Sequence, residues 1–177
     1  MAILLYGTAC RPGEAYSLRW EAVALNRVGG LIQITQGKTA NARRILPMVP
    51  RVHTMLVARH HAQGSPSEGW VFSSLGRCGH IIRQNCSRQH AAALRRSSVK
   101  PFPVYTLRHT ALTRLADAGV DAFTLARIAG HYSVRITERY CHPQREAIKM
   151  AFAKLSLSQK GVTDGGYRLL GEALETQ

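Results

Sequence analysis

The sequence predicts an α+β fold that is mostly α-helical and carries one small three-stranded antiparallel sheet. Between residues 23 and 47, three short apolar runs alternate with turn-rich connections, which is typical of such a sheet. On both sides of that region, apolar residues recur with helical spacing. The length of 177 residues fits about one domain of ordinary size.

Local start and stop signals predict each element in turn. The apolar run at residues 2–9 predicts the end of a helix, and Pro12 suits the first turn of a short helix that continues to Trp20. Strands are predicted at Val23–Leu25, Leu31–Thr35 and Arg43–Pro47. Helices are then predicted at residues 50–62, 80–96, 105–118, 121–129, 133–141 and 143–156.

The elements predict one folded domain over residues 1–157 and a flexible C-terminal tail over residues 158–177, where glycines loosen the chain. No capping signal precedes the apolar run at residue 2, so we expect the first helices of the domain to be missing.

The charge of the chain points to a polyanionic partner. Lys and Arg number 24 against 10 Asp and Glu, which gives a formal net charge of +14. Between Glu21 and Asp117 there are 14 basic residues and a single acidic one, Glu68. These positive side chains repel one another unless an anion neutralises their charge. An arginine guanidinium can donate two parallel hydrogen bonds to one phosphate. Nucleic acid is therefore the expected partner.

Composition excludes several other classes. A hydrophobic content of 45% excludes general disorder, and no apolar run approaches the roughly 20 residues of a membrane span. Four cysteines are too few for a disulfide framework and indicate a reducing, cytoplasmic setting. A metal-dependent nuclease needs clustered carboxylates, which this chain lacks. A zinc site is disfavoured because the candidate ligands have the wrong spacing; these are Cys78, His80, Cys86 and His90.

Four short segments together carry candidate chemistry: Leu5–Glu14, Gly37–Thr39 with Arg43–Pro47, Thr106–Thr110, and Ala129–His131 with Thr137–His142. They present two arginines, a lysine, a histidine and a tyrosine, in the order Arg11, Lys38, Arg108, His131 and Tyr140. In motif, order and spacing, these segments resemble the boxes of the tyrosine recombinase or phage-type integrase family. The resemblance covers residues 3–155 and implies an integrase-type DNA breaking-rejoining core.

The resemblance also implies site-specific recombination of double-stranded DNA, with neither metal nor other cofactor. In that chemistry, Arg11 and Arg108 clamp the phosphate and His131 donates a further hydrogen bond. Tyr140 attacks as a phenolate that nearby positive charge favours, and Lys38 protonates the leaving 5′ oxygen. Fixed cationic donors are the strongest means of stabilising the charge that builds on a phosphate under attack, so the residue types fit the task.

Tyr105 is the main departure from the family pattern, because it stands where the family has a histidine three residues before its second arginine. A tyrosine hydroxyl can donate a hydrogen bond to phosphate but cannot take a proton at neutral pH as an imidazole can. Glu14, one helical turn after Arg11, is expected to support that arginine.

Further residues are assigned to DNA binding and assembly. The expected DNA-binding residues are Arg43, Arg44, Arg83, Arg88, Arg95 and Arg96. The helix predicted at residues 143–156 has an apolar stripe that buries against other residues. The family resemblance implies that this helix docks on a neighbouring subunit, so a homo-oligomer on DNA is expected.

Two alternatives stay open. The chain can be an inactive recombinase remnant, because family members generally carry an N-terminal clamp domain that is not in this sequence. It can also be a non-catalytic DNA-binding module, in which residues 105–118 and 121–129 form a helix-turn-helix. A binding module, however, has no need for Lys38 or for Tyr140 at its distance from His131.

Overall fold

Along the chain, short helices come first, a small sheet follows, and the second half is again helical. The computed structural model describes residues 1–27, 29–36, 42–141, 149 and 152–153. Its elements are α1 (Ala2–Thr8), α2 (Pro12–Tyr16), η1 (Trp20–Ala22), β1 (Val23–Asn26), β2 (Gly29–Ile34), β3 (Arg44–Pro47), α3 (Pro50–Ala62), α4 (Arg83–Arg95), α5 (Thr106–Asp117), α6 (Ala122–Ala129), η3 (Val134–Ile136) and η4 (Glu138–Tyr140). The predicted fold class is confirmed.

The sheet is antiparallel, with the strands in the order β1-β2-β3. Ile32 in the middle strand pairs with Val23 on one side and with Leu46 on the other. Side chains alternate across the sheet, so that Ile32, Ile34 and Leu46 are buried while Leu31 and Ile45 remain exposed. One face of the sheet therefore contributes to the core.

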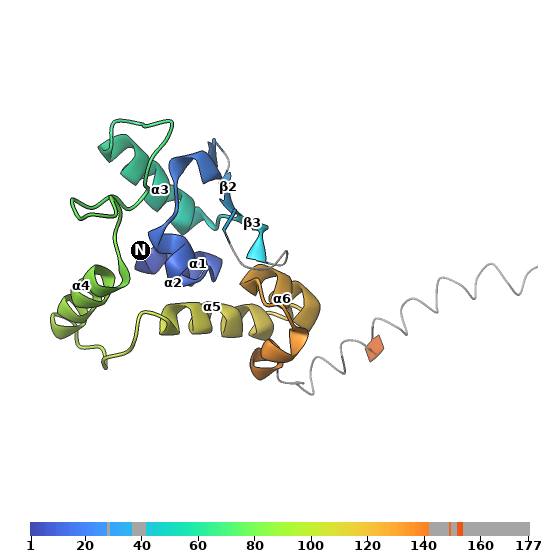
Figure 1. Cartoon of the computed structure of the whole chain (residues 1–177). Helices are drawn as coiled ribbons and strands as arrows, with labels where there is room; N and C mark the ends of the chain where they lie inside the picture. The colour runs from blue at the N-terminus through green and yellow to red at the C-terminus, as the bar shows by residue number, and fades with distance from the viewer. Residues whose placement is uncertain (28, 37–41, 142–148, 150–151, 154–177) are drawn as a thin grey trace, which may run out of the picture. The chain divides into compact units, whose positions relative to one another are not determined.

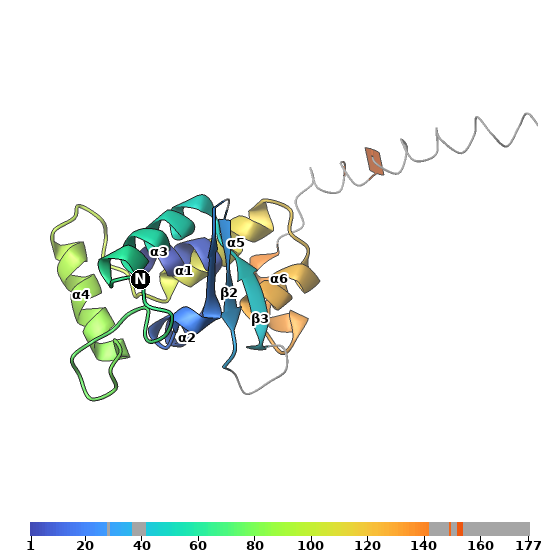
Figure 2. The same cartoon turned by 90° about the horizontal axis from the view of Figure 1, so that it is seen from above.

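Helix α1 lies at the centre of the helical layer (Figures 1 and 2). It packs against α3 and α5, and its Leu4 and Leu5 are completely buried in the same core cluster as Val52 and Leu56 of α3. A Cβ at Gly7 would overlap the side chain of Val52, so the close approach of α1 to α3 requires glycine there.

A second core cluster joins α5, α6 and η4. Leu112, Leu125 and Ala129 are fully buried in it, together with Ala9 at the end of α1 and the ring of Tyr140. Within residues 1–141, helices α4 and α6 lie at opposite ends in both views (Figures 1 and 2).

Several parts of the expected architecture turn out differently or are not described. The helix predicted to continue to Trp20 ends at Tyr16, and Trp20 begins the 3-10 helix η1. The helix predicted over residues 133–141 is wrong, because the segment forms the short 3-10 helices η3 and η4 around the fully buried Thr137. Residues 1–141 form one compact unit, and the chain divides after Cys141. Of the helix predicted at 143–156, only residues 149, 152 and 153 are described, all helical, and the predicted boundary at 157 lies outside the described residues. Within the described part of the chain, no helix is both long and apolar enough to span a membrane.

Candidate active site

Arg11 is held at the start of α2 by a capping box. Pro12 occupies the first helical position, and the Glu14 carboxylate accepts a 2.6 Å hydrogen bond from the Arg11 backbone N–H. The same carboxylate also receives Nη1 of the Arg11 side chain at 3.0 Å. The arginine is therefore fixed by local chemistry, with 35% of its side chain still exposed.

Arg108 lies in the first turns of α5 and is completely buried. Its Nη1 donates to the Ala9 carbonyl at 2.5 Å, and its Nη2 donates to the Ala129 carbonyl at 2.7 Å. Its Nε is buried and has no hydrogen-bond partner among the described residues. An unpaired buried donor costs about 1–3 kcal/mol, so this nitrogen is a candidate donor for a bound anion.

The two arginines converge on the turn that ends α6. Nη2 of Arg11 donates to the Gly130 carbonyl at 2.6 Å, next to the Ala129 carbonyl that Arg108 binds. Gly130 has φ +66, and a Cβ there would lie 2.7 Å from Nη1 of Arg44 and 3.0 Å from Nη1 of Arg11. Only glycine permits both the left-handed backbone and the close guanidiniums.

His131 follows this turn directly and is only 8% exposed. Its Nε2 lies 3.3 Å from Nη2 of Arg108, and its Nδ1 lies 2.8 Å from the Thr137 hydroxyl. Arginine can only donate, so Nε2 accepts and the ring proton sits on Nδ1. Burial and the charges of Arg108 and Arg11 lower the pKa of His131 to about 4. In this state the ring is neutral and Nε2 faces an arginine, so the hydrogen bond expected from His131 to a phosphate requires a change in this contact.

Stability should fall with acidification because of this imidazole. Between the ordinary pKa of 6.5 and the folded value of about 4, the unfolded chain binds the proton first, so the free energy of unfolding decreases as pH falls through this window. Urea unfolding at about pH 7 and about pH 5 measures the slope. We expect a shallower slope in His131→Asn, and equal slopes would show that His131 titrates normally.

Tyr140 is placed beside His131 by η4. Their rings stack with centroids 6.5 Å apart and an interplanar angle of 16°. The hydroxyl of Tyr140 lies 2.6 Å from Nδ1 of His109. Burial, with a contribution from Tyr105, raises the pKa of Tyr140 above its ordinary value, and this outweighs the opposite effect of the cations Arg108 and Arg139. The expectation that nearby positive charge favours the phenolate is therefore not met in this state.

Arg44 requires a correction to the predicted DNA-binding set. Its side chain is only 2% exposed and forms an ion pair with Glu14 at 2.8 Å. It also donates to the carbonyls of Ile128 and Ala42, at 2.7 and 2.9 Å. It cannot reach DNA from there, because it lies on the inward-facing side of β3 with Leu46. Strand alternation puts Arg44 on the same face as Leu46, but the neighbouring Ile45 is equally apolar, so the sequence alone does not show which face is buried.

Glu14 is thus shared between Arg11 and Arg44. Burial alone would raise the pKa of this carboxyl, but hydrogen bonds and charge from Arg44, with smaller effects of Arg11, bring the pKa below its usual value. The carboxylate stays ionised and holds both guanidiniums.

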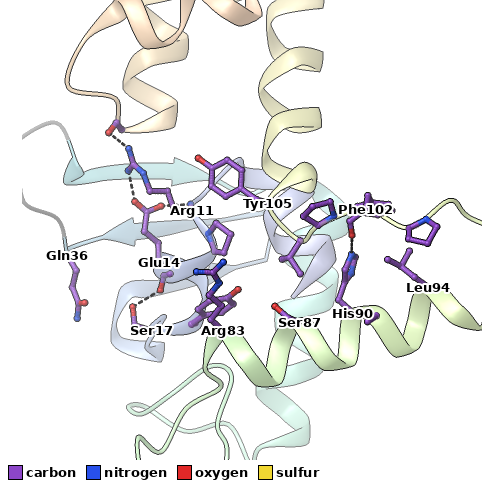
Figure 3. Close-up of a pocket in the computed structure, with 18 of the residues that line it drawn as sticks. Arg11, Glu14, Ser17, Gln36, Arg83, Ser87, His90, Leu94, Phe102 and Tyr105 are labelled. Atoms are coloured by element: carbon purple, nitrogen blue, oxygen red, sulfur yellow. Dashed lines mark hydrogen bonds and ion pairs between the residues drawn. The ribbon is translucent and has the colours of Figure 1, made fainter.

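A cleft of about 1520 Å³ opens next to Arg11. One side carries Arg11 and Tyr105, and α4 forms the other (Figure 3). Gly130 also lines the cleft. The residues of α4 that line it recur on one helical face: Arg83, Ser87, His90, Ala91, Leu94 and Arg95. The other predicted DNA-binding residues, Arg43, Arg88 and Arg96, are exposed but do not line this cleft.

Two predicted site residues complete the comparison. Tyr105 is 43% exposed and packs edge-on against His109, with ring centroids 4.7 Å apart. Lys38 lies outside the described residues.

In the described part of the chain, no group of three or more His, Cys, Asp or Glu side chains is arranged to hold a metal ion. His109 was not singled out in the sequence, although it directly follows Arg108.

The arrangement brings together two arginines, a histidine and a tyrosine from four separate segments. A family model described as the phage integrase family matches residues 1–147. The chain belongs to the phage integrase family.

Relatives of this phage integrase family chain include tyrosine recombinases. XerD of Rhizobium meliloti (strain 1021) is 28% identical over 149 residues, which are 82% of this chain and 47% of that protein. XerC of Bifidobacterium longum (strain DJO10A) is 28% identical over 163 residues, which are 85% of this chain and 44% of that protein.

Solved structures agree on the fold. The crystal structure of XerA recombinase matches 86% of this chain and 55% of its own, with a TM-score of 0.67 and 25% identity. The structure of the Tn1549 transposon integrase in complex with transposon right end DNA matches 88% of this chain and 57% of its own, with a TM-score of 0.69 and 18% identity. The chain thus spans about half the length of the relatives that it matches.

Proposed function

We propose that this chain cuts and rejoins double-stranded DNA at specific sites by attack of Tyr140 on a backbone phosphate. The observation that carries the proposal is the convergence of Arg11 and Arg108 on consecutive carbonyls, directly before the histidine whose ring stacks on Tyr140. Membership of the phage integrase family supports the same reaction class.

Each site residue has its own role in the cleavage of the DNA strand. Arg11, partly exposed, supplies donors to the non-bridging oxygens, where charge builds during attack. Arg108 is completely buried in this state, so its unpaired Nε serves the same oxygens only once the groups that cover it move aside. Tyr140 forms the bond to phosphorus, and Lys38 gives a proton to the departing 5′ oxygen. The resulting 3′-phosphotyrosine keeps the energy of the broken bond. A 5′ hydroxyl can therefore reverse the step and join strands without a nucleotide cofactor.

A bound phosphate also changes the protonation state that is favoured for His131. Its pKa is held low by burial and by the surrounding arginines. A phosphate among those arginines offsets their charge, which favours a protonated ring able to donate from Nε2. The imidazole then joins the two guanidiniums as a donor to the same phosphate.

The DNA backbone, we propose, lies in the cleft between Arg11 and α4. Arg83 and Arg95 line its α4 side, and the net charge of +14 supplies long-range attraction. The Tn1549 integrase was solved in complex with DNA, which supports DNA as the partner. We also propose that residues 1–157 form the catalytic domain, and that residues 143–156 join copies of the chain into a homo-oligomer on DNA.

A nicked DNA duplex tests the proposal, because the short strand released on cleavage diffuses away and traps the covalent intermediate. We expect the wild-type chain to form an adduct that survives denaturation, and Tyr140→Phe to form none while binding the same duplex. Salt-sensitive binding by both proteins without any adduct would establish the binding-module alternative instead.

A further inference from the structure

The hydroxyl of Tyr140 has a specific partner that the sequence motifs do not assign. Nδ1 of His109 lies 2.6 Å from this oxygen, and the two rings are tilted by 36° with centroids 5.7 Å apart. His109 follows Arg108 on α5, so the helix that carries a phosphate-binding arginine also carries the contact to the nucleophile.

A base is needed at this point because Tyr140 is a neutral phenol. Burial raises the pKa of Tyr140, so attack requires that the proton leave during the reaction. Tyr105 stands at the position where the family has a histidine, and a phenol cannot accept this proton near neutral pH. Tyr105 instead packs its ring edge-on against His109.

The surroundings of His109 keep its ring neutral. Tyr105 and Tyr140 pack against it, and the charged groups near it are Arg108 and Arg139. Burial, followed by the charges of these two arginines, lowers the pKa of His109 below its usual 6.5. At neutral pH the ring therefore has a free lone pair, and the short contact places Nδ1 to use it on the phenol.

We propose that His109 is the general base that takes the phenolic proton of Tyr140 during strand cleavage. The inference rests on the proposed function. The Tyr140 oxygen bonds to phosphorus while its proton passes to Nδ1 of His109, and the bond from phosphorus to the 5′ oxygen breaks as that oxygen gains a proton from Lys38. In rejoining, the His109 imidazolium returns its proton to the departing phenolate. The negative charge of the bound phosphate offsets the charges of Arg108 and Arg139, and this stabilises the His109 imidazolium once it forms.

Single-turnover adduct formation by His109→Asn tests the role, because Asn keeps a hydrogen-bond acceptor near the Nδ1 position but cannot carry the proton. We expect a rate about 10²-fold below wild type. The wild-type rate should rise with pH and level off above the pKa of His109, whereas the variant should lose that inflection. His53→Asn, a partly exposed histidine on α3 that contacts the Asn26 carbonyl, is the matched control and should behave as wild type.

A substrate with sulfur in place of the bridging 5′ oxygen separates the two proton transfers. Its thiolate leaves without a proton, so a defect in leaving-group protonation disappears with this substrate. We expect the His109→Asn defect to persist undiminished. Recovery with the sulfur substrate would assign His109 to the leaving group and overturn the inference, as would a wild-type rate and pH profile in His109→Asn.

The tautomer of His109 provides a readout that needs no DNA. NMR spectra of the ¹⁵N-histidine-labelled chain should show the proton on Nε2, and Tyr140→Phe should shift His109 toward a mixture of tautomers. A proton on Nδ1 would make Tyr140 the acceptor and exclude His109 as its base. If the wild-type chain forms no adduct, the proposed function fails; if His109→Asn forms adduct normally, only the present inference fails.

Discussion

Arg108→Lys should bind DNA almost as tightly as the wild-type chain but form the covalent adduct about 10³-fold more slowly. Arg108 is completely buried, so its side chain adds little to the surface that meets DNA, and lysine conserves the charge. Its two terminal nitrogens hold the carbonyls of Ala9 and Ala129 simultaneously. A single ammonium cannot span both carbonyls and still offer a donor to phosphate. The rate should therefore fall with little change in affinity.

The same substitution on an exposed position of α5 provides the control. Arg114 lies on that helix, is exposed, and contacts the Tyr6 ring and hydroxyl. Arg114→Lys should leave the rate of adduct formation within about 2-fold of wild type, as expected for a surface position. Binding titrations and single-turnover assays on the nicked duplex measure both quantities. An Arg108→Lys rate within 10-fold of wild type would contradict a bidentate role for Arg108.

Local chemistry explains why most of the fold was predictable. Pro12 and Pro50 each open a helix, Asp121 accepts backbone hydrogen bonds from Phe123 and Thr124 at the start of α6, and Gly130 ends that helix. These signals act over three or four residues, so the sequence alone displays them. The helix predicted at 121–129 begins one residue later in the structure, and the one at 50–62 matches.

The segment leading to Tyr140 shows where local signals stop being sufficient. Its residues favour a helix over 133–141, but Thr137 is completely buried against His131, and Ser133 caps a short 3-10 helix instead. The predicted helix over 133–141 is interrupted because Thr137 contacts His131 at the end of α6, and this contact forms only in the folded chain. It also directs the phenol toward His109, a partner on another helix that no spacing in the sequence reveals.

Arg44 illustrates a different limit, because charge in a sequence does not say which way a side chain points. A basic run beside the predicted lysine hairpin favoured DNA contact for both Arg43 and Arg44. Arg43 is exposed, whereas Arg44 shares the inward face of β3 with Leu46. A buried guanidinium is tolerable only with a partner, and that partner, Glu14, is 30 residues earlier.

Removing both members of the Glu14–Arg44 pair should destabilise the chain by less than the sum of the two single removals. Arg44→Met leaves the Glu14 carboxylate, 9% exposed, with only Arg11 as its partner, and should lower the free energy of unfolding by about 3 kcal/mol. Glu14→Gln leaves Arg44 buried without its counter-charge and should also destabilise. The double variant removes both charges of the pair, so we expect its loss of stability to be smaller than the sum of the two single losses, with a coupling energy of about 2 kcal/mol.

The exposed pair of Arg19 and Glu21 is the matched control for this cycle. Its atoms are 2.7 Å apart, but both side chains are 41% exposed, so water screens the charges and little coupling is expected. Because the folded pKa of Glu14 is depressed, the coupling is present above the unfolded pKa of about 4.5 and disappears as pH falls through the lower folded value. Urea unfolding of the four proteins of each cycle, at about pH 7 and at successively lower pH, measures both effects. Equal coupling in the two pairs, or coupling that persists in acid, would mean that Arg44 stabilises the fold by packing rather than by its charge.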